Sequence, residues 1–117
     1  MMFDDPHEAL TFAPLMPSRG MIYLSGPMSG LPDFNFSAFR AEAARLRVLG
    51  HAVINPAEIN TDHSLSWEEC LRADIRSLCE CDTLAYMPDW EASKGVHLEM
   101  SIAHRLGIKI VASSSIK

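Results

Sequence analysis

The chain has 117 residues, of which 48% are hydrophobic and 21% charged, with a formal net charge of -5. This length suits one domain that buries about two-thirds of its unfolded surface, enough for a core without disulfides. The acidic balance and scattered basic residues argue against a nucleic acid polymer as partner and leave a small phosphorylated ligand possible.

The first twenty residues, 1–20, predict an irregular arm, because three prolines stand there without apolar periodicity. A loose tail and a pairing segment of an oligomer both fit this pattern. Regular structure is expected from Met21 onward, so residues 21–117 form the predicted domain. Its first element is a buried strand over 21–24, ended by the turn signal Ser25-Gly26-Pro27.

Apolar periodicity and turn signals then predict alternating helices and strands. Phe36, Phe39, Ala43 and Leu46 recur at helical spacing, and Ser66 with Glu69 forms a capping box at the start of a later helix. The predicted elements are a helix from 36 to 50, a strand over 52–54, a polar loop to 66, a helix ending near 81, a strand over 83–87, a loop to 94, a helix to 106 and a strand over 108–112.

This alternation predicts an α/β fold, a three-layer sandwich around a parallel sheet of four to five strands of the Rossmann or flavodoxin-like kind. With the strand order 2-1-3-4, ligands of such a sheet bind beyond the carboxyl ends of the first and third strands, where the order reverses. The loops 25–33 and 88–95 follow those strands and are the expected site.

Cys70, Cys79 and Cys81 form no disulfide framework, because their number is odd and two of them are one residue apart. We expect buried or idle thiols and a reducing, cytoplasmic compartment. The histidines lack metal-ligand spacing, so neither a metal nor another cofactor is expected. No apolar run approaches the roughly 18 residues of a membrane span, and no signal-peptide pattern begins the chain, so no membrane partner is expected.

A carboxylate on the apolar face of the last helix is the most informative feature. Gly95, Glu99, Ile102, Ala103 and Leu106 share this face. A carboxylate in such a stripe is costly unless it is paired or used. Two interpretations are open from the spacing: Glu99 is a functional group at the sheet edge, or it lies at the border of the stripe and reaches solvent.

Two further side chains are candidates for the same edge. Asp74 flanks the apolar stripe of the preceding helix and points either to the carboxyl edge of the sheet or to water. Tyr23 lies inside the first strand, where a core tyrosine needs a hydrogen-bond partner for its hydroxyl. A carboxylate across the sheet edge is an obvious partner.

The two loops at the expected site carry small residues. Ser25 to Gly30 would let backbone amides approach a phosphate or a sugar, although no glycine-rich fingerprint or Walker lysine follows. Ser93 opens the last helix either as an anion site or as an ordinary N-cap, and Trp90 either packs or stacks on a base. The expected substrate contacts are Ser25, Gly26, Met28, Ser29, Trp90, Ser93 and Gly95.

Three sequence blocks together resemble the nucleoside 2-deoxyribosyltransferase superfamily. They are Ile22 to Pro27, Asp74 with Asp82 eight residues later, and Ser93 to Glu99. The similarity covers residues 21 to about 112 and is closest to a small phage and bacterial branch, related to the 2′-deoxynucleoside 5′-phosphate N-hydrolases.

The resemblance implies covalent catalysis. By it, Glu99 is the nucleophile that attacks the anomeric carbon, Asp74 the acid that assists departure of the nucleobase, and Tyr23 the residue that orients the nucleophile, as in a retaining glycosidase. Ser93 matches a serine that contacts the 5′-phosphate in the hydrolases, where the transferases have an aspartate. Ser29 stands where those hydrolases have an arginine.

The sequence therefore favours an enzyme that cleaves the N-glycosidic bond of a (deoxy)nucleoside or nucleoside 5′-monophosphate, without a cofactor. The alternative is a non-catalytic module that binds or sequesters a nucleotide-like metabolite. The set of Tyr23, Asp74 and Glu99 favours catalysis, whereas the missing arginine favours binding. The base, the sugar and the choice between hydrolysis and transfer stay open. The resemblance also implies a homodimer or higher homo-oligomer.

Overall fold

The computed structural model describes residues 20–62 and 64–117. The predicted arm over 1–20 lies outside the described residues, except for Gly20. The elements in chain order are β1 (Ile22–Ser25), η2 (Pro32–Asn35), α2 (Phe36–Val48), β2 (Val53–Ile54), α3 (Pro56–Ile59), α4 (Trp67–Leu78), β3 (Thr83–Tyr86), η3 (Trp90–Ala92), α5 (Lys94–Arg105), β4 (Lys109–Ala112) and η4 (Ser113–Ser115).

The sheet confirms the predicted fold class and strand order. Its four strands lie in the order β2-β1-β3-β4 and every pair is parallel. The register places Ile22 opposite both Val53 and Thr83, and Ser25 opposite Tyr86. From β1 the chain crosses to β2 on one side of it and then to β3 and β4 on the other side. The carboxyl ends of β1 and β3 therefore flank the point where the strand order reverses.

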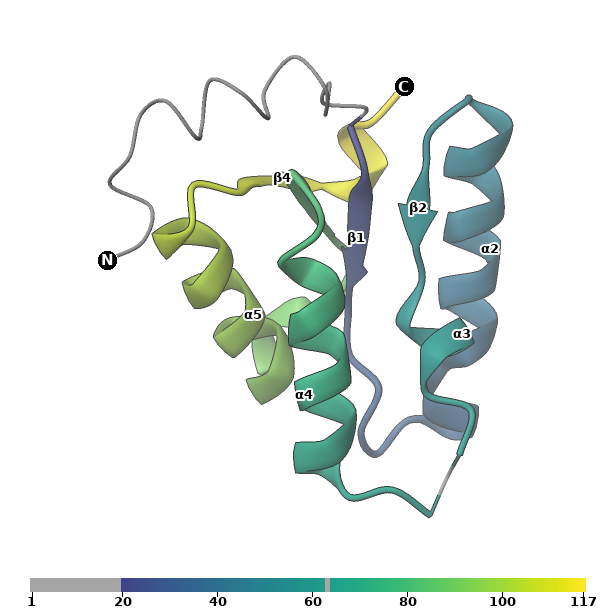
Figure 1. Ribbon diagram of the computed structural model, residues 1–117. Helices are drawn as coiled ribbons and strands as arrows, with labels where there is room; N and C mark the ends of the chain where they lie inside the picture. Colours follow the sequence, from purple (N-terminus) through teal and green to yellow (C-terminus); the bar gives the residue numbers. More distant parts are fainter. Residues whose placement is uncertain (1–19, 63) are drawn as a thin grey trace.

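Helices cover both faces of the sheet and complete a three-layer sandwich. Figure 1 shows α2 and α3 beside β2, and α4 and α5 together on the other side of β1. Alternate residues of β1 pack to opposite faces, as the period of a strand requires. Ile22 and Leu24 join the core cluster with Phe39 and Leu46 of α2, whereas Tyr23 joins the cluster with Leu78 of α4.

The predicted boundaries hold to within a few residues, but four short elements were not predicted, namely α3 and the single turns η2, η3 and η4. The capping box of Ser66 and Glu69 opens α4 as expected, but the helix ends at Leu78 rather than near residue 81. The segment predicted as a polar loop contains the short helix α3, which begins after Asn55 with a side-chain cap on the backbone N–H of Ala57. The pair Asn55-Pro56 closes a strand and starts a helix equally well.

Backbone strain gathers at the carboxyl edge of the sheet. Among the described residues, the non-glycine positions with a left-handed backbone are Asp33, Phe34, Asn35 and Asp89. Each follows β1 or β3. Such conformations cost free energy and cluster at functional sites. No helix within 20–62 or 64–117 has the length and apolarity to cross a membrane.

Candidate active site

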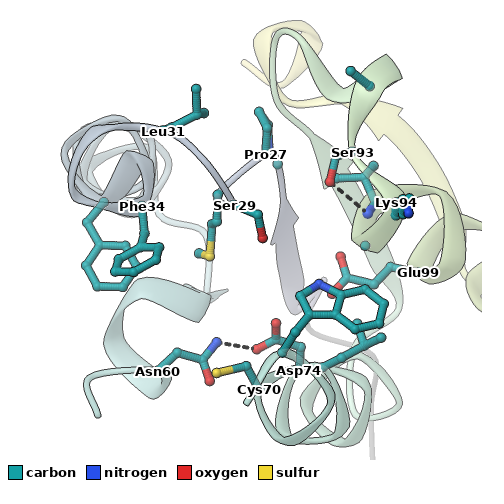
Figure 2. Close-up of a pocket in the computed structure, with 18 of the residues that line it drawn as sticks. Pro27, Ser29, Leu31, Phe34, Asn60, Cys70, Asp74, Ser93, Lys94 and Glu99 are labelled. Atoms are coloured by element: carbon teal, nitrogen blue, oxygen red, sulfur yellow. Dashed lines mark hydrogen bonds between the residues drawn. The ribbon is translucent and has the colours of Figure 1, made fainter. Parts of the chain in front are cut away.

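A cavity of about 780 Å³ opens at this edge of the sheet. Figure 2 shows two of its carboxylates, Asp74 and Glu99, entering from different helices. The loop after β1 forms a further wall. Residues that line the cavity include Gly26, Pro27, Met28, Ser29, Leu31, Phe34, Phe36, Asn60, Asp62, Leu65, Trp67, Cys70, Leu71, Asp74, Asp89, Ala92, Ser93, Lys94, Gly95, Val96 and Glu99.

Glu99 is buried and held at both carboxylate oxygens. Its side chain is 5% exposed. The Tyr23 hydroxyl donates to Oε2 at 2.8 Å, and the Ser25 hydroxyl donates to Oε1 at 2.7 Å. Both donors lie on β1, two residues apart, so their side chains leave the same face of the sheet and reach Glu99 on α5. Of the two interpretations of Glu99, the structure therefore supports the paired, buried carboxylate and not the one that reaches solvent.

Asp74 is also buried, at 8% exposure, and does not point to open water. The side-chain amide of Asn60, itself buried, donates to its Oδ1 at 2.7 Å. Asn60 directly follows α3, so the missed helix supplies the partner of the predicted acid. Figure 2 shows this bond on one side of Asp74, with its other oxygen directed into the cavity.

Burial raises the pKa of both carboxyl groups. The pKa of Glu99 rises to about 7 because desolvation outweighs the hydrogen bonds from Ser25 and Tyr23, and the negative charge of Asp74 adds to the rise. Desolvation raises the pKa of Asp74 to about 6 against the opposing bond from Asn60. The charge of Asp74 acts on Glu99, so the two carboxyls titrate as a coupled pair near neutral pH.

Tyr23 is a donor at every physiological pH. Burial raises the pKa of its hydroxyl well above 10.0, and the negative charges of Glu99 and Asp74 raise it further. The ring is fully buried in the core between the sheet and the α4 side. The hydroxyl therefore keeps its proton and offers it to Glu99, which favours the ionised carboxylate.

The loop after β1 brings three of the four predicted contacts to the cavity wall. Gly26, Met28 and Ser29 line it, whereas Ser25, the last residue of β1, is not among the lining residues and contacts Glu99 instead. A side chain at Gly26 would be crowded, because an added Cβ would lie 3.1 Å from both Met87 Cβ and Phe39 Cζ. This close approach fixes where the loop leaves the sheet.

Ser93 and Gly95 line the cavity at the start of α5, as predicted. The Ser93 hydroxyl caps the helix by accepting from the Val96 backbone N–H at 3.2 Å. A capping hydroxyl still has its own proton to donate. The N-cap interpretation is therefore correct, and it leaves Ser93 able to donate to an anionic ligand at the positive end of the helix dipole.

Trp90 is not among the residues that line the cavity. Its ring packs between Tyr86 and His97, with centroid distances of 5.4 and 5.3 Å. The structure therefore supports the interpretation that Trp90 packs, because its ring contacts two aromatic neighbours. The aromatic side chains that do line the cavity come from other segments, namely Phe34, Phe36 and Trp67.

Two contributions were missed from the sequence. Trp67, Cys70 and Leu71 line the cavity from α4 beside the predicted Asp74, and their helical spacing with Asp74 could have revealed this wall. Asn60 carried no such signal, because it lies in a segment without periodicity, and only the folded chain brings it to Asp74.

The part of the chain that the structure describes contains no group of three or more His, Cys, Asp or Glu placed to hold a metal ion. Cys70 is half-buried, Cys79 exposed and Cys81 buried, and all three are free thiols. Burial raises the pKa of Cys81 to about 12, so this thiol stays protonated.

Comparison with known proteins identifies one family. Residues 20–112 match the family described as a domain of unknown function (DUF4406). The match spans all four strands and the residues of the cavity. No curated protein matches the chain.

Proposed function

The chain belongs to the DUF4406 family, and from the chemistry of its cavity we propose that it cleaves the N-glycosidic bond of a (deoxy)nucleoside or a nucleoside 5′-monophosphate. Glu99 is the proposed nucleophile, Asp74 the proposed acid and Tyr23 the residue that orients Glu99. The resemblance to the nucleoside 2-deoxyribosyltransferase superfamily, carried by the same residues, supports these roles.

One observation carries the proposal. Glu99 is 5% exposed, lines a cavity and receives one hydroxyl donor on each carboxylate oxygen. A buried carboxylate is expensive, and a purely structural one is normally neutralised by a basic partner. The contacts of Glu99 are instead two neutral hydroxyls, which orient a carboxylate and leave its charge available to an electrophilic carbon.

The proposed reaction runs through a covalent glycosyl-enzyme. A lone pair of a Glu99 oxygen forms a bond to the anomeric carbon, and the electron pair of the C–N bond passes to the departing base. The proton on Asp74 moves to that base, which leaves as a neutral molecule. Water or a second base then attacks the anomeric carbon and gives its proton to the Asp74 carboxylate, while the C–O electron pair returns to Glu99, giving hydrolysis or transfer.

The walls of the cavity suit the two ends of such a substrate. Asp74 and its neighbours Trp67 and Leu71 would face the base, since the acid must reach the leaving group. Ser93 and Gly95, at the start of α5, would face the 5′ end of the sugar, where helix N–H groups favour a phosphate.

The charge of the lining residues bears on whether the substrate carries a 5′-phosphate. Besides Asp74 and Glu99, the cavity is lined by Asp62 and Asp89, against Lys94 as the basic residue. Ser29 adds no charge where a related hydrolase would have arginine. A phosphate would therefore depend on Ser93 and the helix end, and we propose that an uncharged 5′-hydroxyl is accepted as well.

We also propose self-association, because apolar side chains surround the mouth of the cavity. Leu31 and Phe34 are each 41% exposed, Leu65 is 39% exposed and Trp67 is 47% exposed. A second copy of the chain would cover such a patch. Sedimentation velocity tests this part of the proposal, and a monomer at every concentration would contradict it.

The activity is tested by incubating the protein with nucleosides and their 5′-monophosphates, with and without an acceptor base, and separating the products by chromatography. Free base or an exchanged nucleoside is expected, and Glu99→Gln should abolish it. Release of base at an equal rate by Glu99→Gln would overturn the proposal. Saturable binding in calorimetry with the ligand recovered intact would instead identify a non-catalytic nucleotide-binding module.

A further inference from the structure

Asn60 makes a contact that the proposed mechanism does not yet use. Its Nδ2 donates to Oδ1 of Asp74 at 2.7 Å, and both side chains are more than nine-tenths buried. The two residues come from different elements, since Asn60 directly follows α3 and Asp74 lies on α4. This bond therefore ties the proposed acid on α4 to the segment that follows α3 (Figure 2).

The backbone around Asn60 holds its amide in place. Asn55 caps the start of α3 through the N–H of Ala57 at 2.9 Å, and the N–H of Asn60 itself donates to the Pro56 carbonyl at 2.9 Å. This single turn has hydrogen bonds at both of its ends. The Asn60 side chain consequently extends toward α4 from a fixed backbone rather than from a free loop.

The other end of the Asn60 amide indicates what the contact is for. Its Oδ1 is buried and has no hydrogen-bond partner among the described residues. A buried acceptor without a partner costs free energy, so Asn60 is a poor choice for packing alone. The bond to Asp74 is the contact that offsets this cost.

We propose, on the premise of the proposed function, that Asn60 is the positioning residue of Asp74 and directs the transferable proton of that acid to Oδ2. An N–H donor at Oδ1 disfavours a proton on the same oxygen, because donor and proton would compete for it. Oδ2 is the oxygen that faces the cavity (Figure 2). The proton leaves from Oδ2 to the nitrogen of the departing base, and the C–N electron pair stays with that nitrogen.

Other titratable groups interact with the charge of Asp74 and could also change its pKa. They are Glu99 on α5, Tyr23 on β1 and Cys70 on α4, each of which feels the charge of Asp74. None of these residues bonds to Oδ1 of Asp74 in the described structure. Loss of the Asn60 amide should therefore act on Asp74 first and reach Glu99 only through charge.

Asn60→Leu tests the proposal, because leucine keeps a similar volume and removes the donor. On a natural nucleoside we expect kcat/KM to fall about 10- to 100-fold, as for loss of a well-placed acid. On p-nitrophenyl 2-deoxyriboside, whose leaving group needs little protonation, the expected loss is less than about threefold. Asp74→Asn should show the same contrast, whereas Ser25→Ala should lose activity on both substrates. Equal losses of Asn60→Leu on both substrates would overturn the proposal.

A second measurement does not depend on activity. Carboxyl carbon NMR follows the titration of Asp74 in the wild type and in Asn60→Leu, where the pKa of Asp74 should rise by about one unit. An unchanged pKa would refute the link even in an active enzyme. A raised pKa in a protein that cleaves no substrate would instead refute the proposed function alone. If Asn60→Leu does not fold, the nearly isosteric Asn60→Asp replaces it. This variant should raise the pKa of Asp74 above the wild-type value, because it removes the donor and adds a negative charge.

Discussion

The hydroxyl of Tyr23 on β1 donates a 2.8 Å hydrogen bond to Oε2 of Glu99 on α5, across 76 positions of the chain. Both groups are buried, so the bond is shielded from water and strengthened by its surroundings. It ties the central strand to the helix that carries the proposed nucleophile. The neighbouring bond from Ser25 makes the same link one pleat further along the strand.

Tyr23→Phe removes one of these two donors and little volume. Because the bond favours ionised Glu99, its loss should raise the pKa of Glu99 further above the present value of about 7. The acid limb of the kcat/KM profile should then move to higher pH. A hydrogen bond to a charged group contributes about 1.5 to 3 kcal/mol, which predicts a loss of roughly 10- to 100-fold near pH 6. If the acid limb of Tyr23→Phe has the same midpoint pH as that of the wild type, the proposed role of Tyr23 is contradicted.

Ser25→Ala should move the acid limb in the same direction, because Ser25 donates to the other oxygen of Glu99. Ser29→Ala is the matched control. Ser29 lies four residues later, on the loop after β1, and lines the cavity, yet it makes no hydrogen bond to Glu99 in the described structure. It should change KM and leave the limb in place. Equal shifts from both variants would show that the loop, and not the Ser25 bond, sets the pKa.

Glu99→Gln should stabilise the protein at high pH. Burial raises the pKa of Glu99 from 4.5 to about 7, so the folded chain holds a proton there that the unfolded chain has already lost. The free energy of unfolding therefore falls as the pH rises from about 4.5 to about 7. Glutamine carries no charge and removes this loss, which is on the order of 2 to 3 kcal/mol at pH 8.

Urea denaturation at pH 5 and pH 8 measures this difference. The stability gain of Glu99→Gln should be largest at pH 8 and fall to about a quarter of that value at pH 5. Glu58→Gln serves as the control with the opposite sign, since its bond to Arg47 lowers the pKa of Glu58 on the protein surface. A gain of equal size at both pH values would show that packing, rather than ionisation, is responsible.

Gly26→Ala should destabilise the fold, because its Cβ would meet Met87 and Phe39 at 3.1 Å. Overpacking of this kind costs about 1 to 3 kcal/mol. Gly95→Ala is the comparison, since an added Cβ there meets only the Ser93 hydroxyl, at 3.8 Å. Thermal unfolding should show a loss for Gly26→Ala and an unchanged or slightly raised midpoint for Gly95→Ala, which also gains helix propensity. A neutral Gly26→Ala would contradict the close approach of the loop.

The elements that were predicted correctly have local causes. The apolar spacing of Phe36, Phe39, Ala43 and Leu46 is visible in the sequence, and these four residues are the buried ones of α2. The box of Ser66 and Glu69 is likewise a contact between near neighbours. The missed helix α3 has four residues, too few to show any period. Its start signal, Asn55-Pro56, is shared with ordinary turns.

The sequence by itself determined the α/β class, the parallel order of the strands and the edge of the sheet where a site would lie. These follow from periodicity and from the few ways in which alternating strands and helices can pack. The tertiary structure alone decided that Glu99 faces Tyr23 and Ser25, that Asn60 holds Asp74, and that Trp90 packs away from the cavity. Such pairings depend on which face each helix turns to the sheet and on contacts between distant segments, and no local pattern encodes those distances.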